Sequence, residues 1–372
     1  MRILLTNTTL AHRTGSELYA AELALALRCR GHDPVVYSPL LGELARELAA
    51  AGVPAVDALD AVGEPPDLIH GHHHTPTLAA LLHFPGVPGL FVCHGYEPWE
   101  EAPLLFPRLL RHVAVDLATA ERLTAAGVPA ARQQTIFNFV DLDRFEPRPP
   151  LPPSPRRALV FSNNARETTH LPAVRTACAA AGIEMDVAGI ASGRVAARPE
   201  ELLPGYDLVF AKGRAAIEAL AVGAAVVLCD AAGCGPMVAS SELARLRSLN
   251  FGFRTLDRPL TAAALSAEIA RYDPVDASEV CSRMRQDAGL DRAVALYLDL
   301  YRRILAEHRA AAAASDPAAE GRAAAAYLRW LDPFLKQRDQ ALIDRAELWR
   351  RLHALEEECE RLRAGGPPST LP

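Results

Sequence analysis

The chain has 372 residues, of which half are apolar and 23% are charged. This length favours two domains over one small module, and the composition excludes a chain that is disordered throughout. With 39 Lys and Arg against 45 Asp and Glu, the net charge is −6, which argues against nucleic acid as a partner.

Apolar runs and cysteines indicate the compartment. Residues 1–7 are too short an apolar run for a signal peptide, and no later run reaches the roughly 18 residues of a membrane span. The seven cysteines are scattered without a CxxC pair, which predicts reduced, mostly buried thiols and neither disulfides nor a zinc site. We therefore expect a cytoplasmic protein.

The first half of the chain alternates short β-rich runs with helical ones. Strands are expected at 3–6, 35–37, 67–70, 90–93, 113–115 and 135–137, and helices at about 16–30 and 43–51. Strands separated by helices predict a parallel sheet with right-handed crossovers. Residues 1–145 are therefore expected to form a Rossmann-like domain.

Residues 146–157 carry six prolines in twelve positions, which excludes a helix or an interior strand and predicts a linker. After it, strands are expected at 158–162, 185–188, 208–211 and 225–230, and helices near 171–181 and 214–222. This second alternation predicts a second Rossmann-like domain over 158–309.

The end of the chain differs in composition from both halves. A second linker is expected at 310–321, where an alanine run gives way to proline and glycine. Residues 322–363 are helix-forming and carry a 4-3-4-3 repeat of Leu348, Leu352, Leu355, Cys359 and Leu362. We expect either a short coiled coil that supports self-association or a helix packed on its own domain, and a disordered end at 364–372.

The first predicted strand leads into a loop that contains Gly15 and Ser16. Thr14 and Glu17 fit a capping box that opens the next helix. Free backbone N–H groups and the helix dipole make such an N-terminus a site for an anion. The pattern is not GxGxxG, which argues against a dinucleotide enzyme, and an ordinary capped helix is the alternative.

Histidines gather at the ends of two predicted strands. His70, His72 and His74 would share one face of an extended chain, which allows a metal site, but no Cys or Asp cluster accompanies them. We therefore expect no metal and place His70 and His72 in a ligand crevice. His94 follows the next strand and is the best candidate for contact with a polar substrate, with a purely structural histidine as the alternative.

The most specific stretch follows the predicted strand at 208–211. It brings Lys212, Gly213 and Arg214 to a helix N-terminus, so that two cations and free amides converge where a diphosphate would sit. Glu218 lies one turn further on, where its carboxylate can accept two hydrogen bonds from a ribose diol. A solvent-exposed Arg–Glu pair is the alternative.

Two motifs carry a resemblance to a known family. The segment 218–227, EALAVGAAVV, resembles the Glu-Ala-Met-Ala-x-Gly-x-Pro-Val-Val signature of retaining GT-B glycosyltransferases of family four. The segment 136–145, IFNFVDLDRF, is similar to that family's Ile-x-Asn-Gly-Val-Asp-x-x-x-Phe segment. Weaker patterns match in the same order at 15–17, 67–70 and 94–95. The resemblance covers roughly residues 1–308.

The resemblance implies a GT-B fold, in which two Rossmann-like domains face each other across a cleft. It implies transfer of a sugar from a nucleotide-sugar donor in that cleft, without a metal or other cofactor. Glu218 would hold the donor ribose, Gly15 would approach the diphosphate, His94 would contact the sugar, and Asn138 would line the cleft. The acceptor would be a glycan, a lipid-linked molecule or a small molecule.

The chain departs from the family pattern in two places. Eight positions before Glu218 the family has a second acidic residue, whereas this chain has Phe210, so the acidic motif is degenerate. The family's Arg and Lys after the first strand of the second domain are absent, and Arg166 is the only cation nearby. We therefore expect Lys212 and Arg214 to supply the catalytic positive charge. The expected donor contacts are Gly15, Ser16, Arg166, Gly213 and Glu218.

Two other functions are compatible with the sequence. A nucleotide-sugar epimerase or hydrolase on the same fold would need acidic residues over the sugar and would consume donor without an acceptor. A catalytically inactive GT-B module would bind a nucleotide or glycan, and Phe210 and the helical tail favour it. The segment 104–112 mixes apolar and basic residues and would suit peripheral contact with a membrane, although a core helix is the stronger interpretation.

Overall fold

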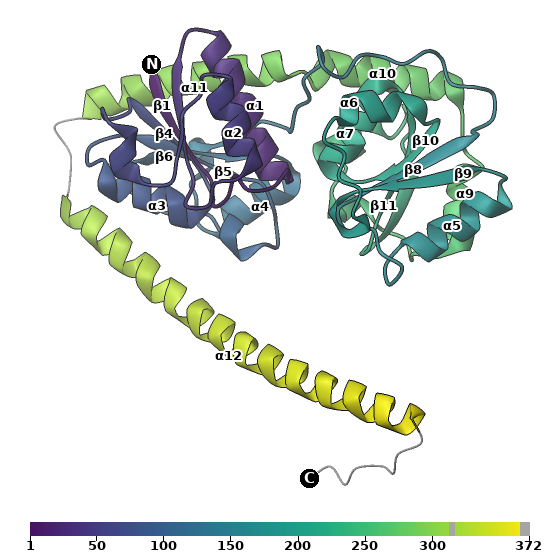
Figure 1. Ribbon diagram of the computed structural model, residues 1–372. Coiled ribbons are helices and arrows are strands. Elements are labelled where there is room, and N and C mark those ends of the chain that lie inside the picture. The colour runs from purple at the N-terminus through teal and green to yellow at the C-terminus, as the bar shows by residue number, and fades with distance from the viewer. Residues whose placement is uncertain (312–316, 365–372) are drawn as a thin grey trace. The chain divides into compact units, whose positions relative to one another are not determined.

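The computed structural model describes residues 1–311 and 317–364 (Figure 1). The chain divides into two compact units, Met1–Ser315 and Asp316–Pro372. The first unit contains two α/β domains, each built on its own sheet, and the second contains the single helix α12 (Pro317–Arg363).

The first sheet has seven parallel strands in the order β3-β2-β1-β4-β5-β6-β7. They are β1 (Arg2–Thr6), β2 (Asp33–Tyr37), β3 (Ala55–Val56), β4 (Leu68–His72), β5 (Gly89–Cys93), β6 (Leu109–Ala114) and β7 (Gln133–Thr135). The helices between them are α1 (Gly15–Cys29), α2 (Glu43–Ala50), α3 (His74–His83) and α4 (Leu117–Ala125). Because helices cover a parallel sheet on both faces, its central strands β4 and β5 are buried along their whole length.

The second sheet has the order β12-β11-β10-β8-β9. Its strands are β8 (Arg157–Phe161), β9 (Glu184–Ala188), β10 (Leu208–Ala211), β11 (Ala225–Asp230) and β12 (Gly233–Met237). The helices of this domain are α5 (Leu171–Ala180), α6 (Pro199–Leu202), α7 (Gly213–Val222), α8 (Leu243–Ser248), α9 (Ala262–Ile269) and α10 (Pro274–Asp287). The predicted α/β alternation is therefore confirmed in both halves. The antiparallel edge strand β12 was not predicted, because two glycines and a proline in five residues do not read as a strand.

Helix α11 (Leu290–Ala311) packs on the first domain, although the sequence analysis assigned residues 158–309 to the second. Its buried face includes Val294, Tyr297 and Tyr301, which join the core that α1 and β1 build. The hydroxyl oxygens of Tyr297 and Tyr19 lie 2.6 Å apart. The amphipathic pattern of α11 was visible in the sequence, but the pattern does not say which sheet its apolar face covers.

Residues 104–112 form neither a core helix nor a basic surface. The segment ends in strand β6, and its residues Leu104, Phe106 and Arg108 are buried. The Arg108 guanidinium donates to the backbone carbonyls of Leu81, Phe84 and Val87, with Nη1 at 3.0 Å from Phe84 O and 2.6 Å from Val87 O. Arg108 is therefore held inside the domain, and Arg111 pairs with Glu307 of α11 at 2.7 Å. Neither cation supports the weaker alternative of peripheral membrane contact.

We expect the Arg108→Ala substitution to lower the free energy of unfolding by about 3 kcal/mol, because three buried carbonyls would lose a charged donor. Denaturant unfolding of the full chain measures this loss. The matched control is Arg132→Ala, at an exposed position, which should change stability by less than about 0.5 kcal/mol. Equal effects of the two substitutions would contradict this interpretation of Arg108.

The tail differs from its predicted bounds at one end. α12 begins at Pro317, earlier than the predicted 322, and ends at Arg363. Residues 310 and 311 close α11, and residues 312–316 of the predicted linker lie outside the described residues, as does the predicted disordered end apart from Ala364. Within the described residues, no helix combines the length and apolarity that a membrane crossing requires.

Candidate active site

A cavity of about 600 Å³ is lined by residues of both α/β domains of the first unit. Its wall includes the N-termini of α1 and α7, the loop that follows β5, and the loops that follow β8 and β11. Parallel α/β sheets bind ligands at the carboxyl ends of their strands, and each of these loops leaves such an end.

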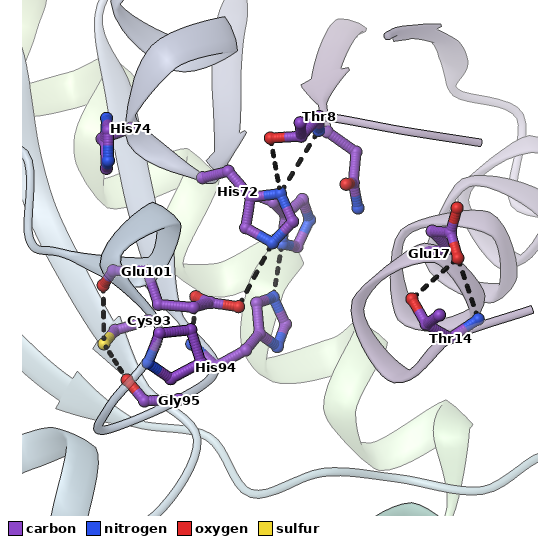
Figure 2. Close-up of polar contacts among 12 residues, drawn as sticks. Thr8, Thr14, Glu17, His72, His74, Cys93, His94, Gly95 and Glu101 are labelled. Atoms are coloured by element: carbon purple, nitrogen blue, oxygen red, sulfur yellow. Dashed lines mark hydrogen bonds and ion pairs between the residues drawn. The ribbon is translucent and has the colours of Figure 1, made fainter. Parts of the chain in front are cut away.

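The N-terminus of α1 is built around the buried carboxylate of Glu17. This carboxylate accepts hydrogen bonds from the backbone N–H and the hydroxyl of Thr14, at 2.9 and 2.7 Å, and from the backbone N–H of His12 at 3.0 Å (Figure 2). The capping box predicted from the sequence is present. Gly15 and Ser16 form the first turn of the helix and line the cavity, where first-turn amides have no helical partner.

The N-terminus of α7 follows β10 directly, with Lys212 as the N-cap. Gly213 has a φ of 57°, in the left-handed region that glycine tolerates, and its N–H donates to Phe251 O at 2.7 Å. The next amides, of Arg214 and Ala215, are left at the cavity wall. Phe210, which stands eight residues before Glu218 where the family pattern has an acidic residue, lies within β10. Its side chain is fully buried in the core of the sheet and does not line the cavity.

Arg214 lies between two carboxylates that come from different domains. Its Nε donates to Glu218 Oε1 at 2.7 Å, and its Nη2 donates to Glu22 Oε1 of α1 at 2.5 Å. All three side chains are largely buried, so the pair is not the solvent-exposed one that was the alternative. Burial lowers the pKa of Arg214, but the two carboxylates outweigh it and raise that pKa. Burial raises the pKa of Glu218 although Arg214 opposes this.

Lys212 is also paired with a carboxylate. Its Nζ lies 3.1 Å from Oδ2 of Asp230, which is itself buried at the end of β11. Asp230 also accepts hydrogen bonds from Ser162 Oγ at 3.1 Å and Asn164 Nδ2 at 3.3 Å. The two cations expected to act as free diphosphate clamps are thus each neutralised by neighbouring acids in this structure.

His94 is the outermost ring of a stack of three imidazoles. Its Nε2 lies 2.6 Å from Nδ1 of His72, and the two rings stack with centroids 4.8 Å apart (Figure 2). The ring of His72 stacks in turn on that of His70, whose Nδ1 lies 2.6 Å from the hydroxyl of Tyr301 in α11. Burial lowers the pKa of His94 to about 4 and that of His70 to about 3, so both rings are neutral at physiological pH.

The unpartnered nitrogen of His72 indicates which tautomer His94 adopts. Nε2 of His72 is buried, and no group in the described part of the chain hydrogen-bonds to it. If His94 Nε2 donated to His72 Nδ1, the ring proton of His72 would be on Nε2. A buried N–H without a partner costs more free energy than a buried lone pair without one. We infer that His72 Nδ1 donates to His94 Nε2, which places the ring proton of His94 on Nδ1. His94 can then donate a hydrogen bond to an oxygen of a ligand in the cavity.

The three alternating histidines do not share one face. β4 ends at His72, His73 turns the chain with a φ of 62°, and His74 begins α3. Nε2 of His73 lies 3.2 Å from Oε1 of Glu101, whose Oε2 accepts from the backbone N–H of His94 at 2.9 Å. Within the described residues no group of three or more His, Cys, Asp or Glu side chains is arranged to hold a metal ion.

The remaining candidates are divided between the cavity and other positions. Asn138 lines the cavity, whereas His70 and His72 lie behind His94 and do not. Arg166 is exposed and does not line the cavity either. Sequence reasoning missed Glu22 and Asp230. The signal for Glu22 was a single acidic residue within the apolar run of α1.

The comparisons with known proteins agree with this architecture. Residues 13–144 match the sequence profile of Glycosyltransferase Family 4. A glycosyltransferase from Rickettsia africae superposes with a TM-score of 0.60 at 15% identity, over 82% of this chain and 98% of its own. HepE of Anabaena, in complex with UDP, superposes with a TM-score of 0.61 at 15% identity, over 81% of this chain and 99% of HepE. Sucrose-phosphate synthase from Thermosynechococcus elongatus superposes with a TM-score of 0.57 at 14% identity, over 82% of this chain and 99% of its own. No curated protein matches the sequence.

The structural likenesses establish the GT-B fold, with two Rossmann-like domains around one cavity. The match to Glycosyltransferase Family 4 lies within the first of these two domains.

Proposed function

We propose that this protein is a glycosyltransferase that takes its sugar from a nucleoside-diphosphate sugar bound in the cavity, without a metal ion and with retention of configuration. One observation carries the proposal: the N-termini of α1 and α7 both open on the same cavity. Each presents first-turn amides, at Gly15 and Ser16 and at Arg214 and Ala215. Two such N-termini suit the two negative phosphates of a diphosphate. HepE, which has the same fold, binds UDP and UDP-glucose.

Glu218 is placed to bind the donor ribose. Its Oε1 accepts from Arg214, and no hydrogen bond from a described residue reaches Oε2, so this oxygen remains for a ribose hydroxyl. Arg214 opposes the rise that burial causes in the pKa of this carboxylate and fixes its orientation, so we assign Arg214 as a positioning residue rather than a diphosphate clamp. The Nδ1–H of His94 would donate to an oxygen of the sugar.

The proposed transfer needs no base from the protein. The bond between the anomeric carbon and the phosphate oxygen breaks, and the acceptor oxygen bonds to that carbon on the same face. The departing phosphate oxygen takes the acceptor's proton. Amides at the two helix N-termini stabilise the charge that grows on the diphosphate. The acceptor is a glycan, a lipid-linked molecule or a small molecule.

A thermal-shift panel of UDP, GDP, ADP and dTDP and their sugar adducts tests the donor site. A ligand at about 100 times its Kd stabilises the folded state by roughly 2.7 kcal/mol, so we expect a clear rise in Tm for one base. No rise with any of them would contradict the donor proposal. Release of diphosphate without an acceptor would favour a hydrolase, and donor binding without turnover on any acceptor would favour an inactive module.

A further inference from the structure

An apolar face of α12 takes no part in the proposed reaction. The helix runs for 47 residues, and none of its residues is buried. Four leucines of the 4-3-4-3 repeat are about half exposed: Leu348 63%, Leu352 52%, Leu355 55% and Leu362 49%. Exposed apolar side chains that recur along one helix face mark an interaction surface.

The repeat follows the heptad of a coiled coil. Leu352 and Cys359 fall at the a position, and Leu348, Leu355 and Leu362 fall at d. The same frame extends back to Phe334, just after the internal Pro333, over roughly four heptads. The earlier core positions are Phe334 and Ala341 at d and Arg338 and Arg345 at a.

We infer that this face pairs with the same face of a second copy of the chain, in a parallel two-stranded coiled coil. The charges beside the core support this occupant. In a parallel pair, each g position faces the e position of the next heptad on the other helix. Arg351 at g would face Glu356 at e of the second copy, and Glu358 at g would face Arg363 at e. Two-fold symmetry repeats both pairs, so all these charges are matched.

The antiparallel alternative matches fewer charges. In an antiparallel pair whose leucines lie opposite one another, Arg351 of one copy faces Glu358 of the other. Glu356 then faces Trp349 of the other copy and pairs with no cation. A parallel pair also brings Asp344 at g beside Arg345 at a of the second copy, which offsets the burial of that cation. Charge matching therefore favours the parallel arrangement.

The mass of the full chain in solution tests the pairing. Light scattering after size exclusion, over a series of concentrations, should give twice the mass of one chain. The Leu352→Asp substitution, at a, should give the monomer. Its matched control is Ile343→Asp, since Ile343 is 58% exposed and falls at f on the outer face, and this variant should stay dimeric. A monomeric unmodified chain, or a dimer that survives Leu352→Asp, would overturn the proposal.

Cys359 tests the orientation. At an a position it meets only itself in a parallel pair, so the two thiols can form a disulfide when diamide takes up their two protons and two electrons. We expect a covalent dimer that persists in Cys29→Ser, the other exposed cysteine, and disappears in Cys359→Ser. A dimer sensitive to Leu352→Asp but without this cross-link would overturn the parallel arrangement. Both readouts are independent of donor binding, so they stand apart from the proposed function.

Discussion

The Arg214→Ala variant is expected to lose both stability and donor affinity. Removal of this guanidinium leaves the buried Glu218 without its ion pair and leaves Glu22 with Arg144 alone, at 3.3 Å, which should cost about 3 kcal/mol of unfolding free energy. The ribose contact of Glu218 should weaken at the same time, by roughly 2 kcal/mol or about 30-fold in donor affinity. Denaturant unfolding and titration with the donor identified by the thermal-shift panel measure the two effects.

A double-mutant cycle separates positioning from direct contact. If Arg214 acts only through Glu218, the donor affinity of the double alanine variant should be no weaker than that of Glu218→Ala alone. If Arg214 holds the diphosphate itself, the two losses should add. The control is Arg166→Ala, because the exposed Arg166 does not line the cavity and should leave both quantities unchanged. Affinity in Arg214→Ala should also depend more strongly on pH, since Glu218 would protonate more easily.

The fold was predictable from the sequence where local pattern and tertiary position agree. β10 and the first five residues of β11 are apolar runs, and the same runs fill the centre of the second sheet. β12 was missed because its place at a sheet edge, rather than its composition, makes it a strand. α11 was not predicted as a separate helix, and its place in the first core depends on contacts with α1 from far along the chain.

The candidate site shows the same division between local and distant signals. The helix N-termini at Gly15 and Gly213 were predictable, because a short loop between strand and helix is a local pattern. Of the two carboxylates that pair with Arg214, only Glu218, one helical turn away, was predictable. Glu22 is 192 residues away and belongs to the other domain. The pairing of Arg214 with Glu22 was not predictable, since an ion pair between domains leaves no trace in sequence spacing.

Buried histidines should make the stability of the chain strongly dependent on pH. Burial lowers the pKa of His70 to about 3 and those of His74, His94 and His112 to about 4, and it also lowers the pKa of His72. In the unfolded chain these groups titrate near 6.5, so the unfolded state binds more protons as the pH falls. The stability present above pH 6.5 is therefore lost progressively toward pH 4.

Between pH 7 and pH 5, protonation of each histidine whose pKa falls to about 3 or 4 should cost about 2 kcal/mol of unfolding free energy, so these four (His70, His74, His94 and His112) together approach the total stability of a typical domain. Urea unfolding at half-unit steps of pH measures this slope, and we expect the first domain to unfold before pH 5. The His112→Leu variant should reduce the slope by about 1.4 kcal/mol per pH unit, because one buried titrating group is removed. The exposed His353 of α12 supplies the control, since His353→Ala should leave the slope unchanged. A stability that stays constant from pH 7 to pH 5 would mean that these rings reach water or a proton partner in the folded chain.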